Sequence, residues 1–315
     1  MRGRDPLLRR TELPLTGTYY PAGFRLDIAT NSEDVLRAAE EAWGHEVPTA
    51  VSTPIVFRIL VQPEGGLAPA PTHRMQGHLY SVVSDCYNFA HLDLRTQFGF
   101  FHLSEQTAAD HSWLRWFFVE SMAYLMLAQR YLVPVHAACV ARNGAGVMLS
   151  GPSGAGKSTL SYGCARAGWT FVSDDCTWLL PNTPERIAIG RPQRARFRLD
   201  APALFPELAS YAVCARPNGK IGIEVPLADL PQILTAPRAP IRGLVFLERG
   251  VGERGLERLG AFHAIERLLA DMPSYGEEVD VIHERTVRRL AEVPAWRMRY
   301  QTLQEAIEIM RTLEI

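Results

Sequence analysis

The feature that most constrains this chain is a glycine-rich stretch near its middle, residues 151–158, which reads GPSGAGKS. It fits the pattern G-x-x-x-x-G-K-[ST], which is typical of a loop that binds nucleotide phosphates. An apolar run at residues 147–149 precedes the loop and predicts a buried strand, and residues 158–165 predict a helix. A strand that turns through glycines into a helix is the context in which this pattern binds nucleotides.

Different residue types in the loop are expected to bind different parts of a triphosphate such as ATP. Glycines let backbone N–H groups approach the phosphates, and the start of the helix adds the positive end of its dipole. Lys157 is expected to neutralise the β- and γ-phosphate oxygens, and the Ser158 hydroxyl to reach Mg²⁺. The expected nucleotide-binding residues are Gly151, Pro152, Ser153, Gly154, Ala155, Gly156, Lys157, Ser158 and Thr159.

A pair of carboxylates, Asp174 and Asp175, follows the loop at the end of a short apolar run, Thr170-Phe171-Val172. The interval from Lys157 holds one helix of about three turns and one strand, and it therefore predicts a βαβ unit. In such sheets ligands bind at the carboxyl ends of the strands, beside the phosphate loop. One carboxylate is expected to hold Mg²⁺ and the other to accept a proton from an attacking hydroxyl, with an Asp pair that merely caps a turn as the alternative.

Composition places the chain among ordinary globular proteins. Hydrophobic residues make up 47% and charged residues 21% of 315, and the formal net charge of −1 gives no electrostatic reason to expect nucleic acid or an anionic membrane as a partner. The five cysteines are scattered without a C-x-x-C pair, which suits a reducing cytoplasm. The most apolar stretch, residues 113–128, is too short to span a bilayer and predicts a buried helix.

The patterning predicts two modules, a mixed α/β module at residues 1–110 and a catalytic module at residues 111–315. In the first, a capped amphipathic helix is expected at 35–43 and strands at 55–61, 78–83, 90–94 and 97–103. In the second, residues 296–300 alternate like an edge strand, and Thr302 with Glu305 predicts a capping box for the last helix. The overall fold class expected is α/β, or α+β when the N-terminal module is included.

His136, the loop and the Asp pair together resemble the catalytic domain of the HPr kinase/phosphorylase family, over about residues 131–180. That family has a His on the strand before the loop, the sequence G-x-S-G-x-G-K-S, and a strand that ends in Asp-Asp; the matching positions are His136, 151–158 and 174–175. The resemblance implies a P-loop kinase core of the HPr kinase and phosphoenolpyruvate carboxykinase type. It also implies ATP and Mg²⁺ as cofactors, and the family includes homo-oligomers.

The same resemblance implies roles for individual residues. Asp175 would accept the proton, Lys157 would assist transfer, His136 would support the acidic pair, and Ser158, Asp174 and Asp175 would surround Mg²⁺. A weaker likeness extends to the apolar run 243–247, where Arg242 would stabilise the transition state. This chain departs from the family in having His136-Ala137 in place of His-Gly and in lacking a metal-binding Glu after the Asp pair.

These observations favour a kinase that transfers the γ-phosphoryl group of ATP to a hydroxyl of a protein or peptide serine or of a small molecule. A nucleotide-hydrolysing switch and a non-catalytic nucleotide sensor are the alternatives. Five arginines between residues 186 and 198 form either a solvated strand with paired charges or a group with at least one contact to nucleotide or substrate.

Overall fold

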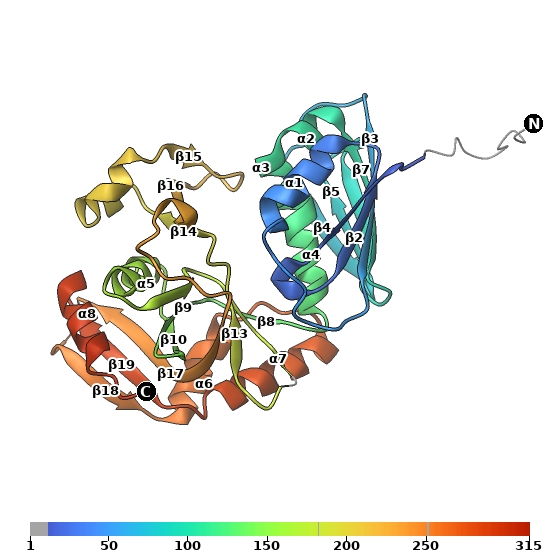
Figure 1. Cartoon of the computed structure of the whole chain (residues 1–315). Helices are drawn as coiled ribbons and strands as arrows, with labels where there is room; N and C mark the ends of the chain where they lie inside the picture. Colours follow the sequence, from blue (N-terminus) through green and yellow to red (C-terminus); the bar gives the residue numbers. More distant parts are fainter. Residues whose placement is uncertain (1–11, 182, 251) are drawn as a thin grey trace, which may run out of the picture. The chain divides into compact units, whose positions relative to one another are not determined.

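The computed structural model describes residues 12–181, 183–250 and 252–315, which form a mixed α/β protein with three sheets. The chain divides into two compact units (Figure 1). Unit 1 comprises Met1–Leu127 with Arg216–Gly219, and unit 2 comprises Ala128–Ala215 with Lys220–Ile315. The helical segment after residue 110 is thus grouped with the first unit, whereas the sequence placed it at the start of the second.

Unit 1 is built on a seven-stranded sheet in the order β1-β2-β3-β7-β6-β5-β4. Its strands are β1 (Leu15–Tyr19), β2 (Leu26–Thr30), β3 (Ile55–Gln62), β4 (Thr72–Gln76), β5 (Leu79–Val83), β6 (Phe89–Asp93) and β7 (Phe98–Ser104). The four strands expected from the sequence are present as β3, β5, β6 and β7. β3 is parallel to both of its neighbours, β2 and β7, and the remaining pairs are antiparallel.

Helices of unit 1 pack on this sheet through apolar stripes. In α1 (Glu33–Trp43), residues at helical spacing are buried, including Val35, Ala39 and Trp43. The apolar stretch 113–128 lies in α3 (His111–Leu114), a π-helical turn η2 (Arg115–Val119) and α4 (Glu120–Ala128). Two shorter elements precede it in the chain, the 3-10 turn η1 (Pro21–Gly23) and the helix α2 (Glu105–Ala109). None of the helices in the described part of the chain is both long and apolar enough to cross a membrane.

Unit 2 contains a nine-stranded sheet and a separate three-stranded sheet. The large sheet runs β11-β9-β10-β17-β13-β12-β8, with β19 beside β17 and β18 beside β19. Its strands are β8 (Val133–Val135), β9 (Ala137–Arg142), β10 (Ala145–Ser150), β11 (Thr170–Ser173), β12 (Thr177–Leu179), β13 (Ile187–Ile189), β17 (Arg238–Arg249), β18 (Gly255–Leu259) and β19 (Ala295–Tyr300). The small sheet has the order β14 (Arg194–Phe197), β16 (Ile221–Pro226), β15 (Val213–Ala215).

Two expectations about this sheet need correction. β10 and β11 are parallel but not adjacent, because β9 lies between them and is antiparallel to both. The expected βαβ unit is therefore a crossover that skips one strand. β19, expected as an edge strand, is internal and pairs with both β17 and β18.

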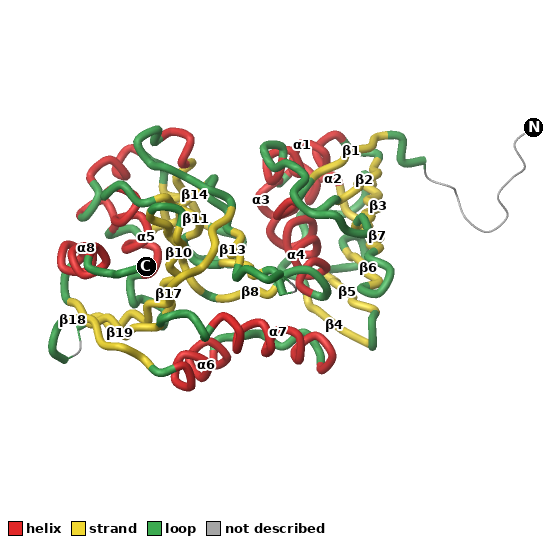
Figure 2. The backbone as a smooth tube through the Cα atoms, turned by 60° about the horizontal axis from the view of Figure 1, so that its bottom comes forward, coloured by secondary structure: helices red, strands yellow, loops and turns green. Residues whose placement is uncertain are grey.

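Helices cover both faces of the large sheet (Figure 2). α5 (Lys157–Arg166) and α8 (Leu303–Arg311) share one apolar core with β9, β10, β17 and β19, whereas α6 (Ala261–Ala270) and α7 (Glu277–Leu290) share the other. The capping box predicted for the last helix is present, with Thr302 and Glu305 bonded to each other's backbone N–H groups. Three 3-10 turns, η3 (Ala201–Ala203), η4 (Pro206–Ser210) and η5 (Leu227–Asp229), accompany the small sheet.

Candidate functional site

The glycine-rich loop, residues 151–156, joins the end of β10 to the first residue of α5, as the motif predicted. Gly154 and Gly156 adopt φ angles of +87° and +96°, which residues with a side chain rarely adopt. A Cβ atom on residue 156 would also lie 2.5 Å from the Tyr300 hydroxyl. Glycine is therefore needed at position 156 both for the backbone conformation and for the space beside it.

Tyr300 holds the loop from the side of β19. Its hydroxyl donates a hydrogen bond to the carbonyl oxygen of Ala155, and its side chain is buried. Burial raises the pKa of Tyr300 from 10.0 to about 12, so that the hydroxyl remains a donor into the alkaline range. The sequence analysis missed this residue, because a Tyr at the end of an apolar strand carries no signal that it reaches a loop 145 residues earlier.

Lys157, the first residue of α5, is only 6% exposed. Its ammonium group donates hydrogen bonds to the carbonyl oxygens of Gly151 (2.7 Å) and Pro152 (3.4 Å). Burial lowers the pKa of Lys157, and the nearby carboxylates of Asp175 and Asp271 oppose that shift. Asp271, directly after α6, is a second acidic group near this lysine that the sequence did not indicate.

The two aspartates of the acidic pair face different partners. The Asp174 carboxylate accepts a hydrogen bond from the backbone N–H of Arg196 in β14 at 2.8 Å, and its own backbone carbonyl accepts one from the Ser158 hydroxyl at 3.2 Å. Burial raises the pKa of Asp174, and the charge of Arg196 works against that shift. Asp174 therefore ties β11, α5 and the small sheet together.

Asp175 is more exposed and lies against His136. Its Oδ1 is 3.0 Å from His136 Nε2, and the two side chains are 61% and 41% exposed. The structure thus joins two residues that are 39 positions apart and that the sequence had proposed as partners. At this exposure the contact contributes little to stability, and its main effect is to orient the carboxylate.

Both residues lie where an antiparallel ladder opens. Val135 of β8 pairs with Thr177 of β12, and Cys139 of β9 pairs with Ser173 of β11, so that three residues lie between the pairs on each side and these two pairs share one register. Between these pairs, residues 136–138 and 174–176 make no ladder pairs with each other. Interruptions of this kind re-aim side chains and are common beside functional sites.

Buried hydroxyls stabilise the opening. The Ser173 hydroxyl lies 2.5 Å from the Thr177 hydroxyl, which donates to the carbonyl oxygen of Ala137 at 2.8 Å. Both hydroxyl-bearing residues are almost fully buried, so that these bonds replace the missing ladder bonds away from water. The opening is therefore a defined structure that places His136 and Asp175 at the surface.

The structure does not bring Arg242 to this site. Ile241 pairs with Gly146 near the start of β10, whereas the loop begins at the other end of that strand, beside Leu247. Leu247 lies five positions further along the extended strand than Arg242, a distance of about 16 Å. Arg249, at the other end of β17, lies nearer to the loop and lines a cavity together with Gly156.

A cavity of about 180 Å³ lies beside the loop in unit 2. Gly156 and Thr159 line it from the loop and α5, and Arg249 and Tyr300 from the ends of β17 and β19; Leu160, Leu204, Gln301, Thr302 and Leu303 complete the wall. No hydrogen bond or ion pair of the Arg249 side chain occurs among the described residues. The cavity thus offers mainly apolar walls with one unneutralised guanidinium.

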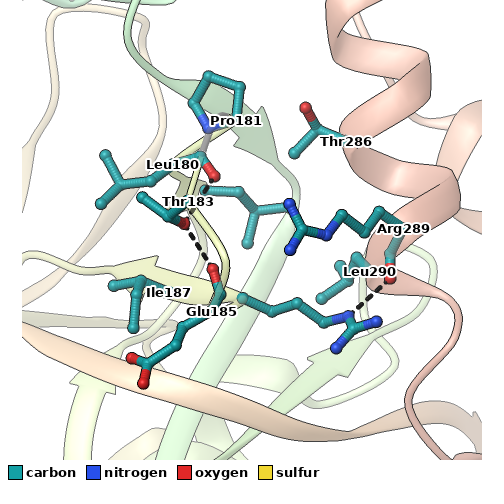
Figure 3. Close-up of a pocket in the computed structure, with 10 residues that line it drawn as sticks. Leu180, Pro181, Thr183, Glu185, Ile187, Thr286, Arg289 and Leu290 are labelled. Carbon is teal, nitrogen blue, oxygen red and sulfur yellow. Dashed lines mark hydrogen bonds between the residues drawn. The ribbon is translucent and has the colours of Figure 1, made fainter.

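A second hollow, between the β12–β13 connection and α7, has a different character (Figure 3). Its volume is about 10 Å³, which is enough for about one water molecule. The Arg186 side chain lines it and donates to the carbonyl oxygen of Arg289 at 2.7 Å. This hollow is part of the packing between the connection and α7.

The oxygen donors near the loop suit a magnesium ion carried in with phosphate. Ser158 and Asp175 supply a hydroxyl and an exposed carboxylate, and Mg²⁺ is commonly held by one or two carboxylates together with substrate phosphates. Within residues 12–181, 183–250 and 252–315, no three or more His, Cys, Asp or Glu side chains form a cluster able to hold a metal by themselves. The predicted ligand Asp174 is turned towards β14.

Comparisons with known proteins give limited similarity. Residues 101–189, less than a third of the chain, match the family described as SynChlorMet cassette protein ScmC. None of the curated proteins matches. A solved structure, the Hpr(Ser) kinase/phosphatase from Coxiella burnetii, aligns over 56% of this chain and 88% of its own with 11% identity and a TM-score of 0.31, which is too low to support an argument about function.

Proposed function

We propose that this chain is a phosphotransferase that moves the γ-phosphoryl group of ATP to a hydroxyl group, in a reaction that requires Mg²⁺. The observation that carries the proposal is the joint placement of Lys157, at the start of α5, and Asp175, which His136 holds at the opening of the ladder. The carboxylate is close enough to oppose the lowering of that lysine's pKa by burial. A cation for the phosphates and a base for the acceptor thus lie together.

The glycine-rich loop is suited to the triphosphate. Its backbone N–H groups and the start of α5 provide donors and a positive dipole for phosphate oxygens. Lys157 is already directed towards the loop, where it bonds to carbonyl oxygens that phosphate oxygens would replace as acceptors. When bound, Mg²⁺ would be held by Ser158 and Asp175 and would neutralise charge on the phosphates.

The chain's own residues supply the proton transfer. Asp175 would accept the proton of the attacking hydroxyl, and His136 would hold the carboxylate in position through the 3.0 Å contact. Lys157 would stabilise charge that develops on the phosphoryl oxygens. The acceptor is a hydroxyl of a protein or peptide serine or of a small molecule, and it would approach from the exposed side of Asp175.

The cavity beside the loop is the proposed place for the nucleoside part of ATP. It directly contacts Gly156 and Thr159, where the phosphate chain would leave the loop. Its apolar walls suit a planar base, and the Arg249 guanidinium can stack on such a ring or contact the nearest phosphate. This placement allows the base and the phosphates to occupy neighbouring parts of unit 2.

The test compares wild type with Asp175→Asn, which keeps the size of the side chain and removes its basicity. Each protein is incubated with γ-labelled ATP, Mg²⁺ and an extract of the host, and transferred label is measured and its carrier identified by mass spectrometry. We expect about 100-fold less transfer by the variant, since general bases contribute about 10²–10⁴-fold, and unchanged binding of ATP in the absence of Mg²⁺.

The matched control is Glu278→Gln, which neutralises an exposed carboxylate in the first turn of α7. It should transfer label like wild type. Equal labelling by wild type and Asp175→Asn would refute the role of Asp175. Rapid release of inorganic phosphate without labelled product would instead identify a nucleotide hydrolase, and ATP binding with neither reaction would identify a sensor.

A further inference from the structure

One arginine extends over the glycine-rich loop from outside it. Arg198 directly follows β14, and its Nη2 atom lies 3.6 Å from the point where residue 154 would carry a Cβ atom. Among the described residues, no other heavy atom beyond the chain neighbours lies within 4 Å of that point. The guanidinium therefore faces the glycine three positions before Lys157, across space that a side chain would otherwise fill.

The charge of Arg198 differs from those of its neighbours in being unpaired. Arg194 Nη1 lies 2.7 Å and Arg196 Nε 3.1 Å from the carboxylate oxygens of Glu224 in β16. These two arginines outweigh the effect of burial and lower the pKa of Glu224. In the part of the chain that the structure describes, the Arg198 side chain makes no hydrogen bond or ion pair, and it is exposed.

The backbone that carries Arg198 is fixed on both sides. Before it, the N–H of Arg196 bonds to the Asp174 carboxylate, and Phe197 is buried and pairs with Ile223 of β16. After it, the N–H of Ala201 donates to the Arg198 carbonyl oxygen at 3.1 Å. The side chain therefore starts from a rigid point that is tied to the same aspartate that accepts the Ser158 interaction.

We infer that Arg198 is a catalytic arginine that binds the oxygen joining the β- and γ-phosphates and stabilises it during transfer. The bond from that oxygen to the γ-phosphorus breaks, a bond from the acceptor hydroxyl oxygen to phosphorus forms, and the hydroxyl proton passes to Asp175. The bond-breaking electron pair remains on ADP, beside Arg198 and Lys157. Arginines placed in this way stabilise transition-state charge in other phosphotransferases. The inference rests on the proposed function.

The test measures binding of a transition-state mimic, so it does not depend on knowing the acceptor. Calorimetry gives the affinities for Mg-ADP and for Mg-ADP with aluminium fluoride in wild type, Arg198→Ala and Arg198→Lys. We expect aluminium fluoride to tighten the binding of Mg-ADP to wild type. In Arg198→Ala this gain in affinity should be smaller by at least about tenfold, while the affinity for Mg-ADP alone should stay within about threefold of wild type. Arg198→Lys should recover part of the gain because it keeps the charge without the fork.

Arg285→Ala removes another exposed arginine, in α7, and should behave like wild type. Circular dichroism checks that each variant is folded. If Arg198→Ala keeps the full gain from aluminium fluoride, or if its affinity for ADP alone falls as much, the inference is overturned while the proposed function stands. If wild type binds neither ATP nor ADP, the proposed function itself fails and the inference with it.

Discussion

At the scale of single residues, Lys157 combines a charge with near-complete burial. An ammonium group away from water is costly unless hydrogen bonds replace its hydration. The carbonyl oxygens of Gly151 and Pro152 provide two such bonds, yet burial still lowers the pKa of the lysine. A triphosphate would supply negative charge at the same place and would favour the protonated form.

This environment predicts that the affinity for ATP falls as the pH becomes alkaline. The lysine must be charged to bind phosphate, so affinity is complete below its lowered pKa and falls as the pH rises through that value, earlier than for an ordinary lysine. Fluorescence titration with a labelled ATP analogue between pH 7 and 10 measures the effect. Lys157→Arg, which does not titrate in this range, should show a nearly flat profile. A flat profile for wild type would contradict the prediction.

The sequence could identify the acidic pair but not its division of roles. Asp174 and Asp175 are adjacent and chemically identical, and only the arrival of β14, 22 residues later, binds one of them to a backbone N–H. The family resemblance points to Arg242 as the transition-state arginine because it precedes an apolar strand, but the register of β17 puts it far from the loop. Both distinctions depend on tertiary pairing, which local patterns do not contain.

At the scale of elements, the strand–loop–helix segment from β10 to α5 was predicted well, because the motif, the apolar run and the glycines all agree. The insertion of β9 between β10 and β11 was not predicted, since an apolar strand reads the same in either direction. The loop gains its shape from two sources, its own positive φ angles and the Tyr300 bond from β19.

Gly156→Ala tests how far the Tyr300 hydrogen bond determines the shape of the loop. Alanine in a left-handed conformation costs about 1–2 kcal/mol, and the new Cβ would also displace the Tyr300 hydroxyl from 2.5 Å. We expect ATP affinity to fall at least about tenfold. Gly168→Ala is the matched control, because residue 168 has a φ of +92° but nothing within 4 Å of its Cβ position. It should lose stability but bind ATP normally, and equal ATP affinities in the two variants would contradict the expectation.

At the scale of the whole molecule, unit 2 contains a buried titratable group remote from the proposed chemistry. His283 in α7 is 2% exposed, and its Nε2 donates to the carbonyl oxygen of Ala128 at 2.9 Å. Burial lowers its pKa from the ordinary value of 6.5. This residue joins α7 to the chain segment that leads into β8, so its charge affects how unit 2 holds together.

The lowered pKa predicts acid destabilisation. Above pH 6.5 the histidine is neutral in both the folded and unfolded chain and has no effect on pH dependence. As the pH falls below 6.5, the unfolded chain binds the proton first, so the free energy of unfolding decreases until the folded pKa is reached. Thermal unfolding between pH 7.5 and 5 should therefore show a larger fall in Tm for wild type than for His283→Gln. If Tm decreased equally in wild type and His283→Gln, the predicted role of His283 would be disproved.

The sequence predicts that the first module ends at residue 110, because a polar stretch, residues 104–107, lies just before that point. The compact units instead separate after Leu127. Segments 111–114, 115–119 and 120–128 are helical, and contacts of α3 and η2 with α1 give them their place in unit 1. Apolar helices do not reveal from sequence which of two cores they join.

The opening in the ladder has a consequence for how this protein can change over generations. Because the pairs Val135–Thr177 and Cys139–Ser173 share one register across the opening, inserting or deleting one residue in only one of the segments 136–138 and 174–176 would turn the side chains beyond the change to the opposite face. Length changes there must therefore come in compensating pairs. Descendants that retain the His136–Asp175 contact should therefore keep these two segments equal in length.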